Sequence, residues 1–167
     1  MHQYGPANAH DTARTPAQWY CLLGGLALLL AGIFGFIADA GFDTGDDVQG
    51  GSFIGFEVNA IHNLIHVASG ALLLVASRRR VSARPVAIGF GLVYGVVAVI
   101  GLVDGSDVLG LIPINSADNV LHVALALLGI VTGLMSRDDT RRHSDTAVDR
   151  TTPPRLTRDQ PRDRARR

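Results

Sequence analysis

The chain has 167 residues, of which 47% are hydrophobic and 18% are charged, and its mean hydropathy is +0.24. This length fits one domain, and so apolar a composition is typical of a membrane protein rather than a water-soluble one. Fifteen basic residues, all of them Arg, balance fifteen acidic residues, so the formal net charge is zero and a nucleic-acid-binding surface is excluded.

Four apolar runs are each long enough to cross about 30 Å of hydrocarbon as a helix. The first and third contain no charged residue and no polar face, which a soluble helix would show at a period of about 3.6 residues. Cys21, in the first run, is expected to serve as a small apolar side chain, and a lone cysteine cannot form an intramolecular disulfide. The predicted fold class is all-α, an integral membrane four-helix bundle with spans at about 19–38, 57–77, 85–103 and 115–135.

The loops and tails predict one orientation. The connection SRRRVSARP, residues 77–85, carries four Arg, which resist translocation, so it is expected in the cytoplasm of the inner (plasma) membrane. Four spans then place both termini in the cytoplasm as well, with the acidic connections outside. Residues 1–17 are expected to be a flexible tail and residues 137–167 a disordered, Arg- and Asp-rich tail, because both contain too few apolar residues to fold. The four-span domain is therefore predicted at residues 18–136.

Two segments of the chain are similar to one another. VNAIHNLIHV, residues 58–67, aligns with INSADNVLHV, residues 114–123, and Gly25 and Gly35 of the first apolar run match Gly91 and Gly101 of the third at a constant offset. The alignment predicts two tandem helical hairpins of the same orientation, related by an axis along the membrane normal. It matches the polar residues in four pairs, which are Asn59 with Asn115, His62 with Asp118, Asn63 with Asn119, and His66 with His122.

These eight polar residues are predicted to form one cluster in the outer half of the membrane. Positions three and four apart share a helix face, and lipid cannot hydrogen-bond, so the two polar faces are expected to meet each other or a cavity. Asn59, Asn115 and Asp118 stand where helix caps are needed. His66 and His122 lie two turns deeper, where no free backbone donor remains, so they require a side-chain partner.

The motifs FEVNAIHNLIHVASG and INSADNVLHVALALLG also carry a resemblance. They are similar to the paired VNxxHNxxH and NxADNxxH signatures of an uncharacterised family of small four-span actinobacterial membrane proteins, described as a domain of unknown function. The resemblance covers residues 18–136 and implies a four-span fold in a membrane. It implies no activity, and no catalytic or binding residue is carried over from it.

Three interpretations of the polar cluster follow. The favoured one is structural: hydrogen bonds among Asn, His and Asp join the two repeats of an accessory membrane protein without a cofactor. In the second, His66 and His122 ligate a haem, or join His62 and Asp118 in a transition-metal site, although no aromatic lining is evident. In the third, the cluster serves transport of a small ligand, proton or ion, although the inner half of the spans offers few polar groups.

No catalytic residue is predicted. The chain lacks a Ser/His/Asp order, a nucleotide-binding loop and the spacing of a metal-dependent hydrolase. The expected partner is the lipid bilayer, with a homo-oligomer or a larger membrane complex left open.

Overall fold

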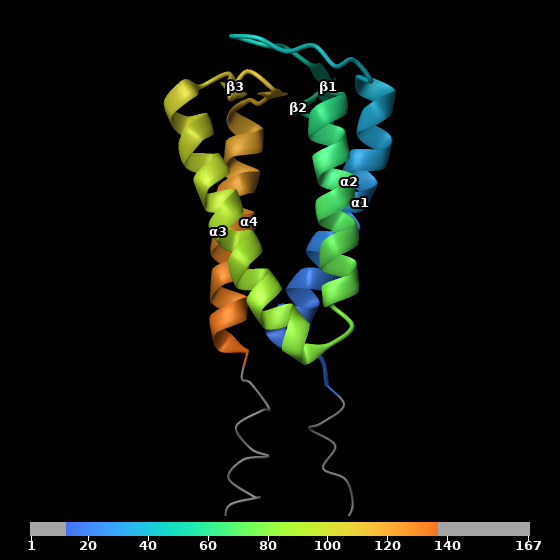
Figure 1. The fold of residues 1–167 in the computed structure, drawn as a ribbon, viewed down its shortest axis with the longest axis vertical. Coiled ribbons are helices and arrows are strands. Elements are labelled where there is room, and N and C mark those ends of the chain that lie inside the picture. The colour runs from blue at the N-terminus through green and yellow to red at the C-terminus, as the bar shows by residue number, and fades with distance from the viewer. Residues whose placement is uncertain (1–12, 137–167) are drawn as a thin grey trace, which may run out of the picture. The chain divides into compact units, whose positions relative to one another are not determined.

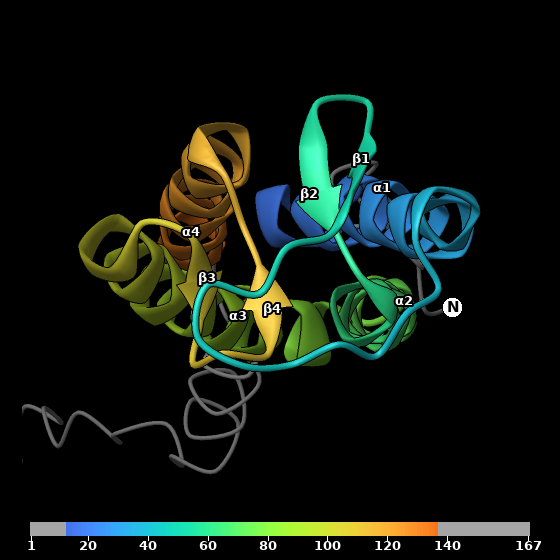
Figure 2. The same cartoon turned by 90° about the horizontal axis from the view of Figure 1, so that it is seen from above.

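The computed structural model describes residues 13–136, which form four helices arranged as two hairpins (Figures 1 and 2). Helix α1 packs along α2, and α3 packs along α4. The all-α prediction is confirmed, while the predicted tails lie outside the described residues except at 13–17. The helices are α1 (Pro16–Ala38), α2 (Ala60–Ala76), α3 (Arg80–Asp104) and α4 (Ser116–Met135).

Each hairpin carries a short two-stranded ribbon at the end opposite the α2–α3 turn; this end is called the outer end and the other the inner end. Strands β1 (Gly51–Phe53) and β2 (Phe56–Val58) pair antiparallel between α1 and α2, and β3 (Asp107–Val108) and β4 (Ile112–Pro113) do so between α3 and α4. Figure 1 places both ribbons at the end opposite the α2–α3 turn. The sequence did not predict these ribbons, because two or three residues per strand are too few for an alternating pattern to stand out.

Three helices begin three or more residues away from the start of the predicted span. Helix α1 begins at Pro16, because Thr15 and Gln18 form a capping box there. Helix α2 begins only at Ala60, because residues 57 and 58 belong to β2. Helix α3 begins at Arg80, since arginine favours helix and Pro85 removes only one backbone hydrogen bond so near the start.

The chain is a membrane protein by the length and composition of its helices. Helices α1, α3 and α4 are long and apolar enough to cross a bilayer, while α2 is apolar but has only 17 residues, about 25 Å at ~1.5 Å per residue. The predicted second span is therefore shorter than expected. Large apolar side chains cover the outer faces of the helices, as at Ile37 (81% exposed) and Val103 (78% exposed). Apolar side chains exposed in this way are favourable in contact with lipid and unfavourable in contact with water.

Glycine allows the helices of each hairpin to approach closely. A Cβ atom on Gly25 of α1 would lie 2.9 Å from the backbone nitrogen of Leu74 in α2. One on Gly91 of α3 would lie 2.7 Å from the carbonyl oxygen of Ala126 in α4. In a bilayer the hydrophobic effect does not drive helices together, so their association depends on close van der Waals packing of this kind.

The two hairpins meet through an apolar core and are tied together at their inner end. The Ala17 amide at the start of α1 donates to the Ser136 hydroxyl at the end of α4 at 2.9 Å. Within the first hairpin, Gln18 Nε2 donates to the carbonyl oxygen of Ser77 at 3.0 Å. The core combines small side chains with a few large ones. It consists of Ala17, Tyr20, Cys21, Leu28, Leu73, Ala76, Ala83, Ala87, Phe90, Tyr94, Leu125 and Ala126.

Candidate functional site

The first layer of polar residues caps helices α2 and α4. Asn59 accepts from the His62 amide at 2.9 Å, and Asn115 accepts from the amides of Ala117 and Asp118. The Asp118 carboxylate in return accepts from the Asn115 amide at 3.0 Å. Capping by Asn59, Asn115 and Asp118 is thereby confirmed, and it satisfies backbone donors that every helix start leaves open.

The same two asparagines reach from one hairpin to the other. Asn59 Nδ2 donates to the carbonyl oxygen of Leu111, and Asn115 Nδ2 donates to that of Gly55, both at 2.9 Å. Donors and acceptors are each 56 residues apart, which is the offset of the aligned motifs. The Glu57 amide adds a third link by donating to Asp118 Oδ2 at 2.9 Å. These bonds join the hairpins at their outer end.

Asn63 and Asn119 do not join the polar cluster that the sequence predicted. Asn63 Nδ2 donates to the carbonyl oxygen of Asp39 at 3.0 Å, and Asn119 Nδ2 donates to that of Gly101 at 3.1 Å. Each bond stays within one hairpin, because Gly35 and Gly101 have no side chain and leave room for the amide on that side. These two residues therefore stabilise the hairpins individually.

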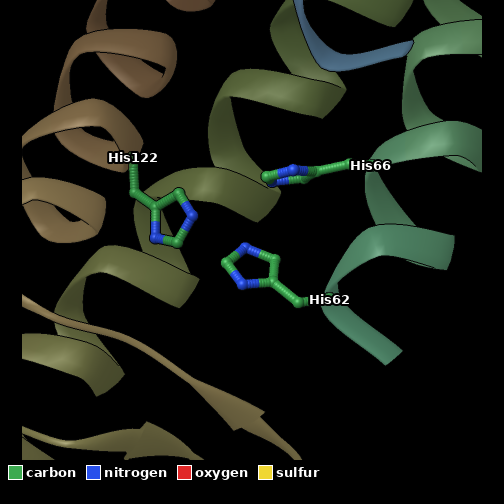
Figure 3. Close-up of side chains that lie close together, drawn as sticks. All are labelled: His62, His66 and His122. Atoms are coloured by element: carbon green, nitrogen blue, oxygen red, sulfur yellow. The ribbon is translucent and has the colours of Figure 1, made fainter. Parts of the chain in front are cut away.

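His62, His66 and His122 come together between the hairpins (Figure 3). All three are buried, and one nitrogen from each ring lies within 4.8 Å of the others. The ring centroids of His62 and His66, one turn apart on α2, are 4.4 Å apart, and those of His62 and His122 are 6.2 Å apart. Figure 3 shows the two α2 rings and the α4 ring converging on one region.

Most nitrogen atoms of this group have no hydrogen-bond partner among the described residues. His62 Nδ1 lies 2.9 Å from the carbonyl oxygen of Glu57, so this nitrogen carries the hydrogen and Nε2 is left with its lone pair. His62 Nε2, both nitrogens of His66, and His122 Nδ1 are buried and unpaired. Each such atom costs about 1–3 kcal/mol of desolvation, so the group is expensive unless something binds it.

Asp118 stands apart from the three rings. Its Oδ2 atom already accepts from two backbone amides, those of Glu57 and Asn115. Its negative charge still acts on His62 electrostatically. The four-residue ligand set predicted from the sequence thus becomes three converging histidines with one carboxylate nearby.

Helix α3 supplies aromatic residues that the sequence analysis missed. The Tyr94 ring meets His122 edge to face at 5.3 Å between centroids, and Phe90 stacks on Tyr94 at 4.3 Å. The expectation that the histidines have no aromatic lining is therefore wrong. Phe90 and Tyr94 are four residues apart on an otherwise aliphatic helix, and this spacing was the available signal.

Comparison with known proteins adds a family but no activity. A family model described as a domain of unknown function (DUF4383) matches residues 18–135. Searches of curated proteins and of solved structures found no match. The matched segment contains all three histidines and both capping asparagines.

Proposed function

The chain belongs to the DUF4383 family, whose function is unknown, and we propose that it is a membrane protein that binds one divalent transition-metal ion through His62, His66 and His122. The observation that carries this proposal is the convergence of three buried imidazoles whose facing nitrogens have no partner among the described residues. Neutral imidazole is a common ligand for zinc, copper, iron and nickel.

The three nitrogens are near enough to one another to become three ligands of one tetrahedral ion, with its fourth position open. Zinc binds histidine nitrogen at about 2.0–2.1 Å, so three ligands of a tetrahedral ion lie about 3.3 Å apart. The present separations, all within 4.8 Å, require small side-chain rotations to reach that value. The Glu57 carbonyl holds His62 in the tautomer whose Nε2 can bind metal, as backbone carbonyls commonly do for metal ligands.

The other interpretations explain less of this geometry. Hydrogen bonding between hairpins is carried by Asn59 and Asn115, so a structural role accounts for them and leaves the histidines unexplained. A haem ligated by both His66 and His122 needs the two imidazoles on opposite faces of a wide ring, whereas three rings converge here. In the described part of the chain, the side chains of the inner half are mostly apolar, so they offer a transported ion few polar contacts.

We infer that the two hairpins arose by duplication and then diverged at the site. The reciprocal bonds of Asn59 and Asn115, 56 residues apart, support this relationship. The aligned pair that differs in charge is His62 and Asp118. One copy thus contributes two imidazoles, and the other contributes one imidazole and one carboxylate.

Metal analysis tests the proposal directly. The full chain, purified in detergent with a histidine-free tag, stripped with chelator and equilibrated with zinc, is expected to retain one zinc ion per chain. His62→Gln, His66→Gln and His122→Gln should each weaken binding by more than the ~10–100-fold typical of outer-shell partners. His143→Gln, outside the described residues, is the matched control and should bind as the wild type does. Equal loss from all four variants, or no zinc retained by the wild type, would refute the site.

We propose that the inner end of the helices faces the cytoplasm, with both termini on that side. The four Arg of residues 78–84 support this orientation, because positive residues resist translocation. A reporter active only in the cytoplasm should be active when fused after Arg142 and inactive when fused after Asp46. The opposite result at either position would reverse the orientation.

A further inference from the structure

A cavity of about 530 Å³ adjoins the three histidines, between α2 and α3. Its volume lies in the range of about 300–1,000 Å³ typical of small-molecule sites. Along α2 it extends from His62 to Leu72, and along α3 from Val86 to Val97. At ~1.5 Å per residue these segments are each about 15 Å long, so the cavity is elongated along the helices.

The cavity is polar at one end and apolar along the rest. His62, His66 and His122 lie at its outer end, whereas Leu72 and Val86 line its inner end. Among the described residues that line it, none is Arg, Asp or Glu. This division matches a molecule with one polar head and one apolar chain.

The mouth of the cavity opens sideways toward lipid. The side chains of Ile65, Leu72 and Val93 line it and are 40%, 54% and 60% exposed on apolar helix faces. A ligand would therefore enter from the bilayer, with its chain parallel to the lipid chains. Ser69 and Tyr94, which are hydrogen-bonded to each other, are the remaining polar side chains on the walls.

Charge balance indicates what the head group should be. A divalent ion on three neutral imidazoles brings two positive charges into an apolar interior, which is unfavourable unless they are compensated. The Asp118 carboxylate accepts hydrogen bonds from the Glu57 and Asn115 amides, which favour its ionised form, and it supplies one negative charge near His62. One further negative charge is needed, and the open fourth position of the ion is the place for it.

We propose that the fourth ligand of the metal is the carboxylate of a fatty acid, whose chain occupies the cavity between α2 and α3. This inference rests on the proposed metal site and adds its ligand class. The histidines bind the ion, and Asp118 compensates part of its positive charge. The apolar walls favour a carboxylate that carries an apolar chain.

Cobalt makes the coordination visible, because its absorption spectrum changes with its ligands. The full chain, freed of lipid in a non-ionic detergent, is loaded with cobalt and titrated with laurate. The controls are acetate, which has the carboxylate without the chain, and dodecanol, which has the chain without the carboxylate. Laurate is expected to change the cobalt spectrum at one equivalent, with an affinity at least tenfold above that of acetate, and dodecanol should not reproduce the change.

Two tryptophan variants test whether the chain lies in the cavity. Gly89 lines the cavity and a Cβ atom there would meet nothing within 4 Å, so Gly89→Trp should fill the space and weaken laurate binding at least tenfold. Val96→Trp, on the lipid-facing side of the same helix, should stay within twofold of the wild type. Both variants should still bind cobalt, which serves as the check that they are folded.

The outcomes separate the two proposals. If cobalt binds but laurate acts no better than acetate, or if dodecanol gives the same spectrum, the fatty-acid ligand is wrong and the metal site stands. The same conclusion follows if Gly89→Trp binds cobalt and laurate as the wild type does. If cobalt does not bind at all, both proposals fail.

Discussion

Zinc at a thousand times its dissociation constant should raise the free energy of unfolding by about 4 kcal/mol, because an ion that binds only the folded state stabilises it by mass action. The measurement is equilibrium unfolding in mixed micelles, with zinc and with chelator. The stabilisation should shrink as the pH falls, since protons compete with the metal for imidazole nitrogen. A variant with all three histidines replaced by Gln should unfold identically under both conditions.

His66→Leu tests the same site more specifically. Its effect on the free energy of unfolding should differ in sign between chelator and zinc. In chelator the substitution removes two buried, unpaired nitrogens and keeps an apolar side chain, so it should be neutral or stabilising by about 1 kcal/mol. In zinc it removes a ligand and should lose most of the stabilisation. If His66 were instead a hydrogen-bonded link between hairpins, the substitution would be destabilising to the same degree in both conditions.

Gly91→Ala is expected to destabilise the protein by about 3 kcal/mol, at the upper end of the usual range for overpacking. The new methyl group would lie 2.7 Å from the Ala126 carbonyl oxygen and 2.9 Å from the Ile130 amide nitrogen. Both atoms belong to the backbone of α4, which cannot rotate away as a side chain can. Relief requires the two helices to separate, with loss of packing along their whole contact. Unfolding of the metal-free protein in mixed micelles measures this effect.

Gly95→Ala is the matched control on the same helix. Its methyl group would lie 3.7 Å from the Ala126 side chain, which is an ordinary van der Waals contact. Replacing glycine by alanine within a helix favours folding by up to about 1 kcal/mol. The two variants should therefore shift stability in opposite directions. Equal effects at positions 91 and 95 would show that close backbone contact does not limit this interface.

The sequence was sufficient for the helices and for the capping residues, because both depend on local chemistry. Continuous apolar runs can be satisfied only as helices in lipid, so the all-α fold followed directly. Asn59 and Asn115 could be recognised as caps because an N-cap bonds to an amide only two or three residues away. Short-range geometry of this kind needs no knowledge of how the helices pack.

The arrangement between helices was beyond such reasoning. The motif placed eight polar residues in one cluster, yet Asn63 and Asn119 turn to their own hairpins, because glycine at 35 and 101 leaves space there. The motif equally suggested Asp118 as a ligand, although its carboxylate is occupied by backbone amides from two segments of the chain.

Sequence alone determined which residues are polar within the apolar helices and which of them share a helix face. Tertiary structure alone decided which of them meet, since two histidines of α2 reach the one of α4 only when the hairpins pack as they do. It also decided that most of their nitrogens lack hydrogen bonds and that the three rings adjoin a cavity between α2 and α3. The physical reason is that helical periodicity sets the direction of a side chain from its own axis, whereas ligand distances depend on the separation and rotation of different helices.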